Sequence, residues 1–338
     1  MKEKTKTLAE LAAELGLSTA TVSRALHGDP SVLPETTKRV TEAAKGLNVR
    51  TRLPSAQKRG GNTALIVSAN LSNPITLGFI DGLRGSLSEL GIKSMITLTD
   101  YDGARECEAL GYAAANGMTA VFLLNAIESP RLIELIDKCG VPVVLVNRYL
   151  EKRETDIVMI DNYRCGFLAA DYLIKRGHRK IAHIAGPETS VTCRDRTRGF
   201  LDAMNEAGLD GNEYLFFGDR TFDAGTAFAA KWLSMPEKKR PTALFSTTGL
   251  MAAGAVTALR REGVRVPEQM SVIINDDYSR SYNPSPVDFT CYGRDPVAMG
   301  KTAAELLSER LTEPSSPPKR IILPPVLTEY NSVLKGNI

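Results

Sequence analysis

The chain has 338 residues, of which 43% are hydrophobic and 24% charged, an ordinary composition for a globular protein. No apolar run reaches the roughly 20 residues of a membrane span, and the N-terminus lacks the apolar core of a signal peptide, so we expect a cytoplasmic protein with no membrane association. The five cysteines are scattered and form no CxxC pair, which predicts reduced thiols and neither a disulfide framework nor a zinc site.

The net charge of +3 is unevenly distributed along the chain. Residues 1–60 contain 11 Lys and Arg against 6 Asp and Glu, whereas the rest of the chain contains 31 against 33. A small basic head on a near-neutral body is typical of a protein whose head meets a polyanion. The alternative is a solvated basic surface with no such partner.

The first predicted elements lie in residues 8–28, LAELAAELGLSTATVSRALHG. Leucines and alanines at helical spacing predict a first helix, Gly16 can end it with a positive φ, and Ser18 is placed to cap a second helix. A third helix is predicted over residues 34–45. These three helices predict a helix-turn-helix unit whose second helix is exposed.

The exposed face of that second helix carries short side chains and one arginine. Threonine and alanine can contact base edges or a thymine methyl group, and arginine can bind guanine with two hydrogen bonds. The residues on this face are Thr19, Ala20, Ser23 and Arg24. Basic residues beside it, including Lys38, would contact flanking phosphates. The alternative is a plain three-helix bundle that contacts another protein.

The run TLAELAAELGLSTATVSRALHGDPSVLPETTKRV resembles the DNA-binding head of the LacI-type repressors (the LacI/GalR family), whose signature is a Val-Ser-x-x-Thr-Val-Ser-Arg sequence. The resemblance implies that Thr19 and Ala20 select the operator sequence, while Thr21, Ser23 and Arg24 hold the backbone or a shared base. The full set of DNA-binding residues implied in this way is Thr7, Ser18, Thr19, Ala20, Thr21, Ser23, Arg24, His27, Lys38, Arg52 and Leu53.

Residues 48–61, NVRTRLPSAQKRGG, have the basic, Pro- and Gly-containing composition of a linker. In the family this segment forms a hinge helix that inserts a leucine into the minor groove. Here Gln57 stands where that leucine is expected, and Leu53 is the substitute in a shifted register. Glutamine is a poor wedge between base steps, so it stays open whether this hinge bends DNA.

The body alternates strands and helices. Strands are expected at 63–69, 92–98, 119–124 and 142–147, and again at 180–186, 214–219, 242–247 and 271–275. This alternation predicts an α/β fold of two similar lobes with parallel sheets, and a ligand cleft at the carboxyl ends of the strands. A helix at 296–312 and a strand at 320–325 would close the chain back across both lobes.

The body resembles the family's effector domain, which is similar to a periplasmic sugar-binding protein; matching stretches include GVPVVLVNR and IDNYRCGFLAADYLIKRGHRKIAHIAGP. The expected fold is therefore a small all-α head followed by a two-lobed periplasmic-binding-protein-like effector domain. The expected domains are a helix-turn-helix head (1–47), a hinge linker (48–61) and an effector domain (62–338). Lobe 1 is expected to contain about 62–160 and 291–318, and lobe 2 about 161–290 and 319–332.

No catalytic constellation is evident in the sequence. The chain has three histidines, and it contains no Gly-x-Ser-x-Gly elbow, phosphate-binding glycine loop or metal-ligand spacing. His178 and His183 are expected to be structural, and the pair Asp276–Asp277 is interpreted as a strand end near the cleft. The sequence therefore predicts a binding protein without cofactor or metal, and not an enzyme.

The resemblance places these residues in the effector cleft: Asn70, Asn147, Thr192, Arg196, Arg220, Thr248 and Asp277. Members that bind neutral ligands commonly carry acids where Asn147 and Gly249 stand, and a stacking aromatic where Arg220 stands. Two acids and an aromatic stacking surface are thus expected to be missing. Arg196 and Arg220 could clamp a carboxylate or phosphate, which predicts a sugar acid or a sugar phosphate. The alternative is that Arg220 turns outward or pairs with a nearby aspartate, which would leave the ligand neutral.

These inferences predict a transcriptional regulator, most simply a repressor of carbohydrate-catabolism genes. Two heads of a homodimer would contact half-sites of pseudo-palindromic double-stranded operator DNA, and a small-molecule effector between the lobes would change DNA affinity. A dimer is favoured because the sequence after the last strand, NSVLKGNI, has no leucine heptads. The alternative is a catabolite-control-type global regulator whose corepressor is a phosphorylated carrier protein. A free-standing sugar-binding protein would need a signal peptide and no head.

Overall fold

The computed structural model describes residues 8–18, 21–22, 25, 32–44, 62–275 and 287–334. The chain forms two compact units, residues 1–58 and residues 59–338. The first corresponds to the predicted head with most of the predicted linker, and the second contains the predicted effector domain.

The head contains helices α1 (Leu8–Leu15) and α3 (Pro34–Ala44), with Thr21, Val22 and Ala25 also helical. Gly16 has the predicted positive φ, 67°. The Ser18 hydroxyl accepts a hydrogen bond from the Thr21 N–H at 3.0 Å, which confirms the predicted N-cap. A small core holds the described parts together: Leu11, Ala12, Val22, Ala25 and Val40 are buried in one cluster.

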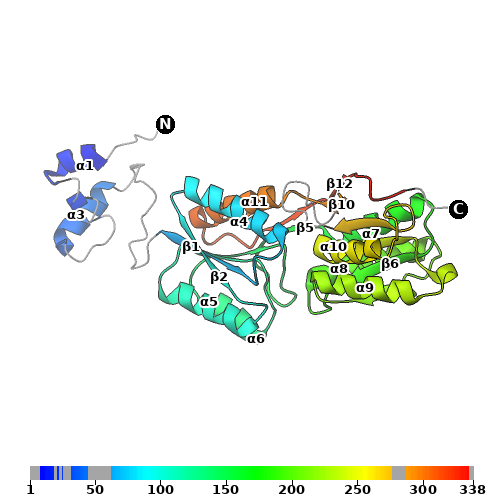
Figure 1. Cartoon of the computed structure of the whole chain (residues 1–338). Helices are drawn as coiled ribbons and strands as arrows, with labels where there is room; N and C mark the ends of the chain where they lie inside the picture. The colour runs from blue at the N-terminus through cyan, green and yellow to red at the C-terminus, as the bar shows by residue number, and fades with distance from the viewer. Residues whose placement is uncertain are drawn as a thin grey trace. The chain divides into compact units, whose positions relative to one another are not determined.

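Lobe 1 contains a six-stranded sheet in which every strand is parallel to its neighbours. In spatial order the strands are β11 (Arg320–Leu323), β5 (Asp156–Ile160), β4 (Val143–Val146), β3 (Ala120–Leu123), β1 (Thr63–Ser68) and β2 (Lys93–Leu98). Helices α4 (Pro74–Glu89) and α11 (Pro296–Thr312) cover one face, and α5 (Gly103–Ala115) and α6 (Pro130–Lys138) cover the other (Figure 1). Because both faces are covered, the central strands are apolar throughout, as in the fully buried VVLV of β4.

Lobe 2 repeats this plan and adds one antiparallel edge strand, β12. Its strands in spatial order are β12 (Val326–Thr328), β10 (Thr290–Gly293), β9 (Ser271–Asn275), β8 (Ala243–Ser246), β6 (Ile181–Ala185) and β7 (Leu215–Phe217). Helices α7 (Asn162–Lys175) and α8 (Val191–Glu206) pack together, as do α9 (Phe222–Ser234) and α10 (Gly249–Arg261), and a 3-10 turn lies at Glu237–Lys239. The predicted α/β, two-lobed fold is confirmed.

The chain passes between the lobes three times, and two of these crossings differ from the predicted bounds. Residues 291–293 were expected in lobe 1, but they belong to β10, which extends the lobe 2 sheet because Thr290 pairs with Ile273 of β9. β11 was expected in lobe 2, but it pairs in parallel with β5 and so completes lobe 1. In both cases the strand pairs with an open edge of one of the two sheets. The hydrophobic pattern of a strand does not indicate which edge it will join.

Two pairs of helices cross closely because glycines, which have no side chain, lie at the crossing points. A Cβ atom built on Gly166 of α7 would overlap the carbonyl oxygen of Arg196 on α8, and one on Gly199 of α8 would overlap that of Tyr163. Gly225 and Gly254 have the same role between α9 and α10, each lying against backbone of the partner helix. The glycines therefore bring paired helices close together and fix the position of Arg196 on α8.

A buried ion pair ties the C-terminal helix to lobe 1. The Arg310 side chain of α11 donates two hydrogen bonds to the Asp156 carboxylate of β5, at 2.7 and 2.8 Å. The two side chains are only 11% and 6% exposed, and the Lys319 N–H also donates to Asp156 at 2.8 Å. The charges are thus paired and hydrogen-bonded, which is what a buried ion pair requires.

Candidate functional site

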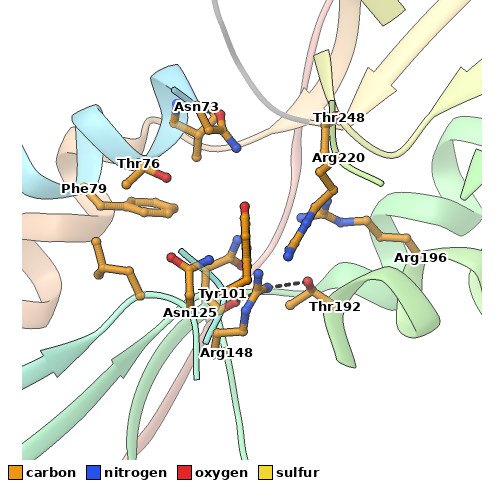
Figure 2. Close-up of a pocket in the computed structure, with 13 residues that line it drawn as sticks. Asn73, Thr76, Phe79, Tyr101, Asn125, Arg148, Thr192, Arg196, Arg220 and Thr248 are labelled. Carbon is orange, nitrogen blue, oxygen red and sulfur yellow. Dashed lines mark hydrogen bonds between the residues drawn. The ribbon is translucent and has the colours of Figure 1, made fainter. Parts of the chain in front are cut away.

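A cavity of about 460 Å³ lies between the lobes at the carboxyl ends of the strands (Figure 2). It lies at the position expected for a ligand site in this topology. Its lining residues are Asn73, Ile75, Thr76, Phe79, Tyr101, Leu124, Asn125, Asn147 and Arg148 from lobe 1, and Thr192, Arg196, Arg220 and Thr248 from lobe 2.

Five of the seven predicted effector residues line this cavity. They are Asn147, Thr192, Arg196, Arg220 and Thr248. Each follows a strand of its sheet or lies in the first two turns of the next helix, so the parallel topology brings them together although they span 102 positions of the chain.

The other two predicted residues do not contribute to the described cavity. The Asn70 side chain is turned onto its own loop, where its Oδ1 accepts hydrogen bonds from the N–H and the hydroxyl of Ser72, at 3.2 and 2.8 Å. Asp277 lies outside the described residues. The structure thus does not support Asn70 as a cavity residue, because a local turn uses its side chain.

Arg196 is rigidly held at the floor of the cavity and is 4% exposed. Its Nε donates to Asn162 Oδ1 and its Nη1 donates to the Thr247 carbonyl, both at 2.9 Å. The close α7–α8 crossing at Gly166 places this part of α8 directly against α7. The guanidinium is therefore positioned by its neighbours before any ligand binds.

Arg148 also lines the cavity, although the sequence did not lead us to assign it to the effector site. It is 8% exposed, and its Nη1 donates to the Thr192 hydroxyl at 2.5 Å and to the Asn147 carbonyl at 3.1 Å. Burial, together with the positive charges of Arg220 and Arg196, lowers the pKa of the Arg148 guanidinium below its ordinary value. Its place directly after Asn147, at the carboxyl end of β4, is the signal that could have identified it.

Arg220 faces the cavity instead of turning outward. Its guanidinium lies 4.9 Å from the centre of the Tyr101 ring, which belongs to the other lobe. Figure 2 shows the side chains of Arg148, Arg196 and Arg220 pointing toward one another. Among the described residues, no carboxylate lies within the 4.0 Å ion-pair distance of Arg148 or Arg220.

Two aromatic side chains line the cavity at positions other than that of Arg220, where an aromatic was expected to be missing. Phe79 of α4 and Tyr101, in the loop after β2, both line the cavity. Phe79 lies one helical turn beyond Ile75 and Thr76, and Tyr101 has a positive φ of 60°. The cavity therefore has an aromatic wall on lobe 1 facing an arginine-rich wall on lobe 2.

Three contacts hold the lobes together beside the cavity, all between the segment after β4 and the start of α8. Besides the Arg148–Thr192 bond, the Tyr149 hydroxyl donates to Asp195 at 3.1 Å. Arg194 pairs with Glu151 at 2.7 Å. These three contacts, Arg148–Thr192, Tyr149–Asp195 and Glu151–Arg194, join lobe 1 to lobe 2 on this side of the cavity.

A buried acid lies behind Arg148. Glu106 of α5 is 1% exposed; its Oε2 accepts from the Ile127 N–H at 2.9 Å, and its Oε1 has no hydrogen-bond partner among the described residues. Burial raises the pKa of Glu106 to about 7, although the Ile127 N–H and the charge of Arg148 both favour the carboxylate.

The histidines of the effector unit are structural, as predicted. His183 is fully buried, stacks on Phe245 with ring centres 4.6 Å apart, and has its ring nitrogens 3.1 Å from the Phe245 carbonyl and the Thr197 hydroxyl. His178 joins the Thr242 hydroxyl to the Leu334 carbonyl. Within the described ranges, no group of three or more His, Cys, Asp or Glu side chains could hold a metal ion.

Three of the predicted DNA-binding residues can be placed. Ser18 and Lys38 are exposed, and Thr21 is half-buried with its hydroxyl 2.8 Å from that of Ser18. The others lie outside the described residues: Thr7, Thr19, Ala20, Ser23, Arg24, His27, Arg52 and Leu53. In the part of the chain that the structure describes, no helix is long and apolar enough to cross a membrane.

A basic head of the helix-turn-helix type, joined to a two-lobed receptor with a cavity between its lobes, defines a DNA-binding regulator that responds to a small molecule. Residues 7–51 match the family described as bacterial regulatory proteins, lacI family, and residues 170–333 match the periplasmic binding protein-like domain. The chain belongs to the LacI family of transcriptional regulators, as its sequence motifs predict.

Two relatives span nearly the whole chain. The HTH-type transcriptional regulator CelR of Thermobifida fusca is 33% identical over 327 residues, which cover 94% of this chain and 95% of that protein. The HTH-type transcriptional repressor PurR of Aliivibrio fischeri strain MJ11 is 31% identical over 336 residues, which cover 97% and 98%. The solved structure of a transcriptional regulator CelR–cellobiose complex has a TM-score of 0.71 and 30% identity, and covers 97% of this chain and 99% of that one.

Regulators of this family bind DNA and a small-molecule effector and act in the cytoplasm; they are not enzymes. The protein is accordingly a DNA-binding transcriptional repressor controlled by a small molecule.

Proposed function

We propose that this repressor controls carbohydrate-catabolism genes and that its effector is an anionic sugar derivative bound between the lobes. The observation that carries the proposal is the group of three arginines in the cavity, of which Arg148 and Arg220 have no carboxylate partner among the described residues. A buried positive charge without a partner is costly, and an anionic ligand removes that cost. The similarity to the CelR–cellobiose complex supports a sugar-like body for the ligand.

The same arrangement gives the ligand a way to act on DNA binding. Arg148 belongs to lobe 1, whereas Arg196 and Arg220 belong to lobe 2, so an anion between them stabilises the closed arrangement of the lobes. A ligand that binds one arrangement of the lobes more tightly changes the affinity for DNA through linkage. Two heads of a homodimer then bind or leave the half-sites of a pseudo-palindromic operator, with Thr19 and Ala20 as the proposed selective residues.

Thermal denaturation of the full chain tests the effector class. Neutral sugars are compared with their matched uronic acids and sugar phosphates, since a ligand that binds only the folded state raises the melting temperature. We expect acids or phosphates to raise it and neutral sugars to leave it unchanged. Arg220→Gln is expected to weaken binding by roughly tenfold or more, the effect of losing a charge-assisted hydrogen bond.

Arg261→Gln is the matched control, because Arg261 is exposed at the end of α10 and does not line the cavity. If Arg220→Gln binds the anionic ligand as tightly as the unmodified chain does, the arginine clamp is wrong. If a neutral sugar alone raises the melting temperature, the anionic class is wrong. If no small molecule does so, a phosphorylated carrier protein becomes the ligand to test by pull-down.

A selection from random duplex DNA tests the operator proposal independently of the effector. We expect the full chain to enrich pseudo-palindromic sites. Exchange of Thr19 and Ala20 for other residues is expected to change the enriched sequence, while substitution of Lys38 weakens binding to all sequences alike. Enrichment of the same site by the exchanged variant would show that other residues select the operator.

A further inference from the structure

We propose that the anionic group of the effector is doubly charged, a phosphate monoester, and that Arg148 is the residue that selects this charge. The inference rests on the proposed function, because it narrows the ligand of the same cavity.

Counting charge in the cavity leads to a dianion. Arg148 and Arg220 each bring a positive charge that no described carboxylate neutralises within 4.0 Å. Arg196 is left out of the count because Asn162 and Thr247 already take its Nε and Nη1 donors, although these neutral groups do not cancel its charge. A carboxylate neutralises one of the two charges and leaves the other, beside it, without a counter-charge from the ligand. A phosphate monoester, which carries about −1.5 to −2 at pH 7, neutralises both.

The hydrogen-bond donors that remain fit a tetrahedral oxyanion. Within the described residues, Arg148 donates only through Nη1, to Thr192 and Asn147, so Nε and Nη2 are left to donate. Arg220 lies over the Tyr101 ring and donates no hydrogen bond to any other described residue. A phosphate has three terminal oxygens for such donors, and the planar guanidinium binds two of them at once.

The start of α8 adds further donors next to Arg148. Thr192, which accepts the bond from Arg148, lies in the first turn of this helix. The N-cap residue Ser190 makes no capping bond to the helix backbone, because its hydroxyl is paired with that of Thr192 at 3.2 Å. The first N–H groups of α8 therefore stay free of a side-chain cap beside the arginines, in the geometry that favours phosphate.

The rest of the cavity suits the uncharged body of a sugar. Phe79 provides a flat apolar wall on lobe 1. The Oδ1 of Asn125 accepts from the Ala69 N–H at 2.9 Å, so its Nδ2 group is left to donate to a ligand oxygen. A second cavity of about 250 Å³ adjoins the first and shares Ile75, Phe79 and Asn147 with it. The phosphate would thus lie toward lobe 2 and the sugar ring toward lobe 1.

Two probe ligands that differ in net charge test whether the cavity prefers a dianion to a monoanion. Methyl phosphate is a dianion at pH 8, whereas dimethyl phosphate has the same phosphoryl group and a single charge. Acetate serves as a monoanion of the carboxylate kind. Each is titrated into the full chain at constant ionic strength, and the melting temperature gives the apparent Kd.

We expect methyl phosphate to bind at least tenfold more tightly than dimethyl phosphate or acetate. Arg148→Gln is expected to reduce this preference to within about twofold, since it removes one of the two positive charges, while Arg261→Gln keeps the full preference. The comparison of probes on the unmodified chain needs no variant, so it decides whether the cavity prefers a dianion even if Arg148→Gln fails to fold.

The outcomes separate this inference from the proposed function. If dimethyl phosphate and acetate bind as tightly as methyl phosphate, and all three lose affinity in Arg220→Gln, the site takes a monoanion and only the dianion inference fails. A preference for methyl phosphate that persists in Arg148→Gln would show that Arg148 does not select the charge. If none of the anions binds while a neutral sugar does, both the inference and the proposed anionic class are wrong.

Discussion

Replacing Glu106 with glutamine is expected to flatten the pH dependence of the protein's stability. The pKa of this buried carboxyl is raised from 4.5 to about 7 in the folded protein. Between these two values the folded state holds a proton that the unfolded chain has lost, so the free energy of unfolding falls as the pH rises. The full difference of two to three pKa units corresponds to about 3 kcal/mol, at about 1.4 kcal/mol for each unit.

Urea unfolding of the full chain and of Glu106→Gln at pH values from 5 to 8 measures this effect. Glutamine resembles the protonated carboxyl in shape and still offers an oxygen to the Ile127 N–H, so the variant should keep its stability as the pH rises. We expect the free energy of unfolding of the unmodified chain to fall relative to Glu106→Gln by up to about 1.4 kcal/mol per pH unit, and to level off above pH 7. Glu108→Gln is the matched control, because Glu108 lies on the same helix and is exposed. Parallel stability curves for Glu106→Gln and the unmodified chain would refute the reasoning, because they would show that the carboxyl titrates alike in the folded and unfolded chain.

Two further predictions concern the framework that holds the site. Gly166→Ala is expected to lower the free energy of unfolding by about 2 to 4 kcal/mol and to weaken anion binding, because the new Cβ overlaps the Arg196 carbonyl. Gly85→Ala is the control, since nothing lies within 4 Å of its new Cβ, and it should be neutral or mildly stabilising. Urea unfolding measures both variants. Equal effects of the two glycine substitutions would contradict the close helix crossing. Asp156→Asn is expected to lower the free energy of unfolding by about 3 to 5 kcal/mol, because it leaves the buried Arg310 charge unpaired. The double variant, Asp156→Asn with Arg310→Met, should recover part of that loss because the unpaired charge is gone. If the double variant is no more stable than the single one, the unpaired charge is not the cause.

Much of the fold could be predicted from hydrophobic pattern and helix-end residues. Gly16, Ser18 and Pro34 mark helix boundaries through their own backbone chemistry, which does not depend on the rest of the fold. Three strands, β5, β10 and β12, were not predicted, because their sequences lack such signals. β5 begins with a charged residue, Asp156, whose partner Arg310 is far away in sequence. β10 and β12, which are neighbours at one end of the lobe 2 sheet, have only four and three residues, too few to show a period.

The candidate site was predicted in outline, because the carboxyl ends of parallel strands meet at one place. Asn147, Thr192 and Arg196 were found through the family resemblance, whereas their neighbour Arg148 was not, although it follows the same strand. Tyr101 depends on a backbone conformation with a positive φ in a non-glycine residue, which the sequence does not indicate. The absence of a carboxylate partner for Arg148 among the described residues is a property of the packed structure alone.

The interleaving of the two lobes also determines how the protein is completed during synthesis. Lobe 1 lacks its edge strand β11 and the covering helix α11 until residue 323 has been made. Lobe 2 lacks β12 and the Ser332 hydroxyl, which accepts from the Thr290 N–H and donates to the Val272 carbonyl. Until residues 296–332 leave the ribosome, a growing chain therefore carries two sheets with an open edge, one of which also has an uncovered face. Both lobes are then completed almost together. The late segment gives a nascent chain its longest exposure to edge-to-edge association, and it makes the two halves of the receptor a single folding unit.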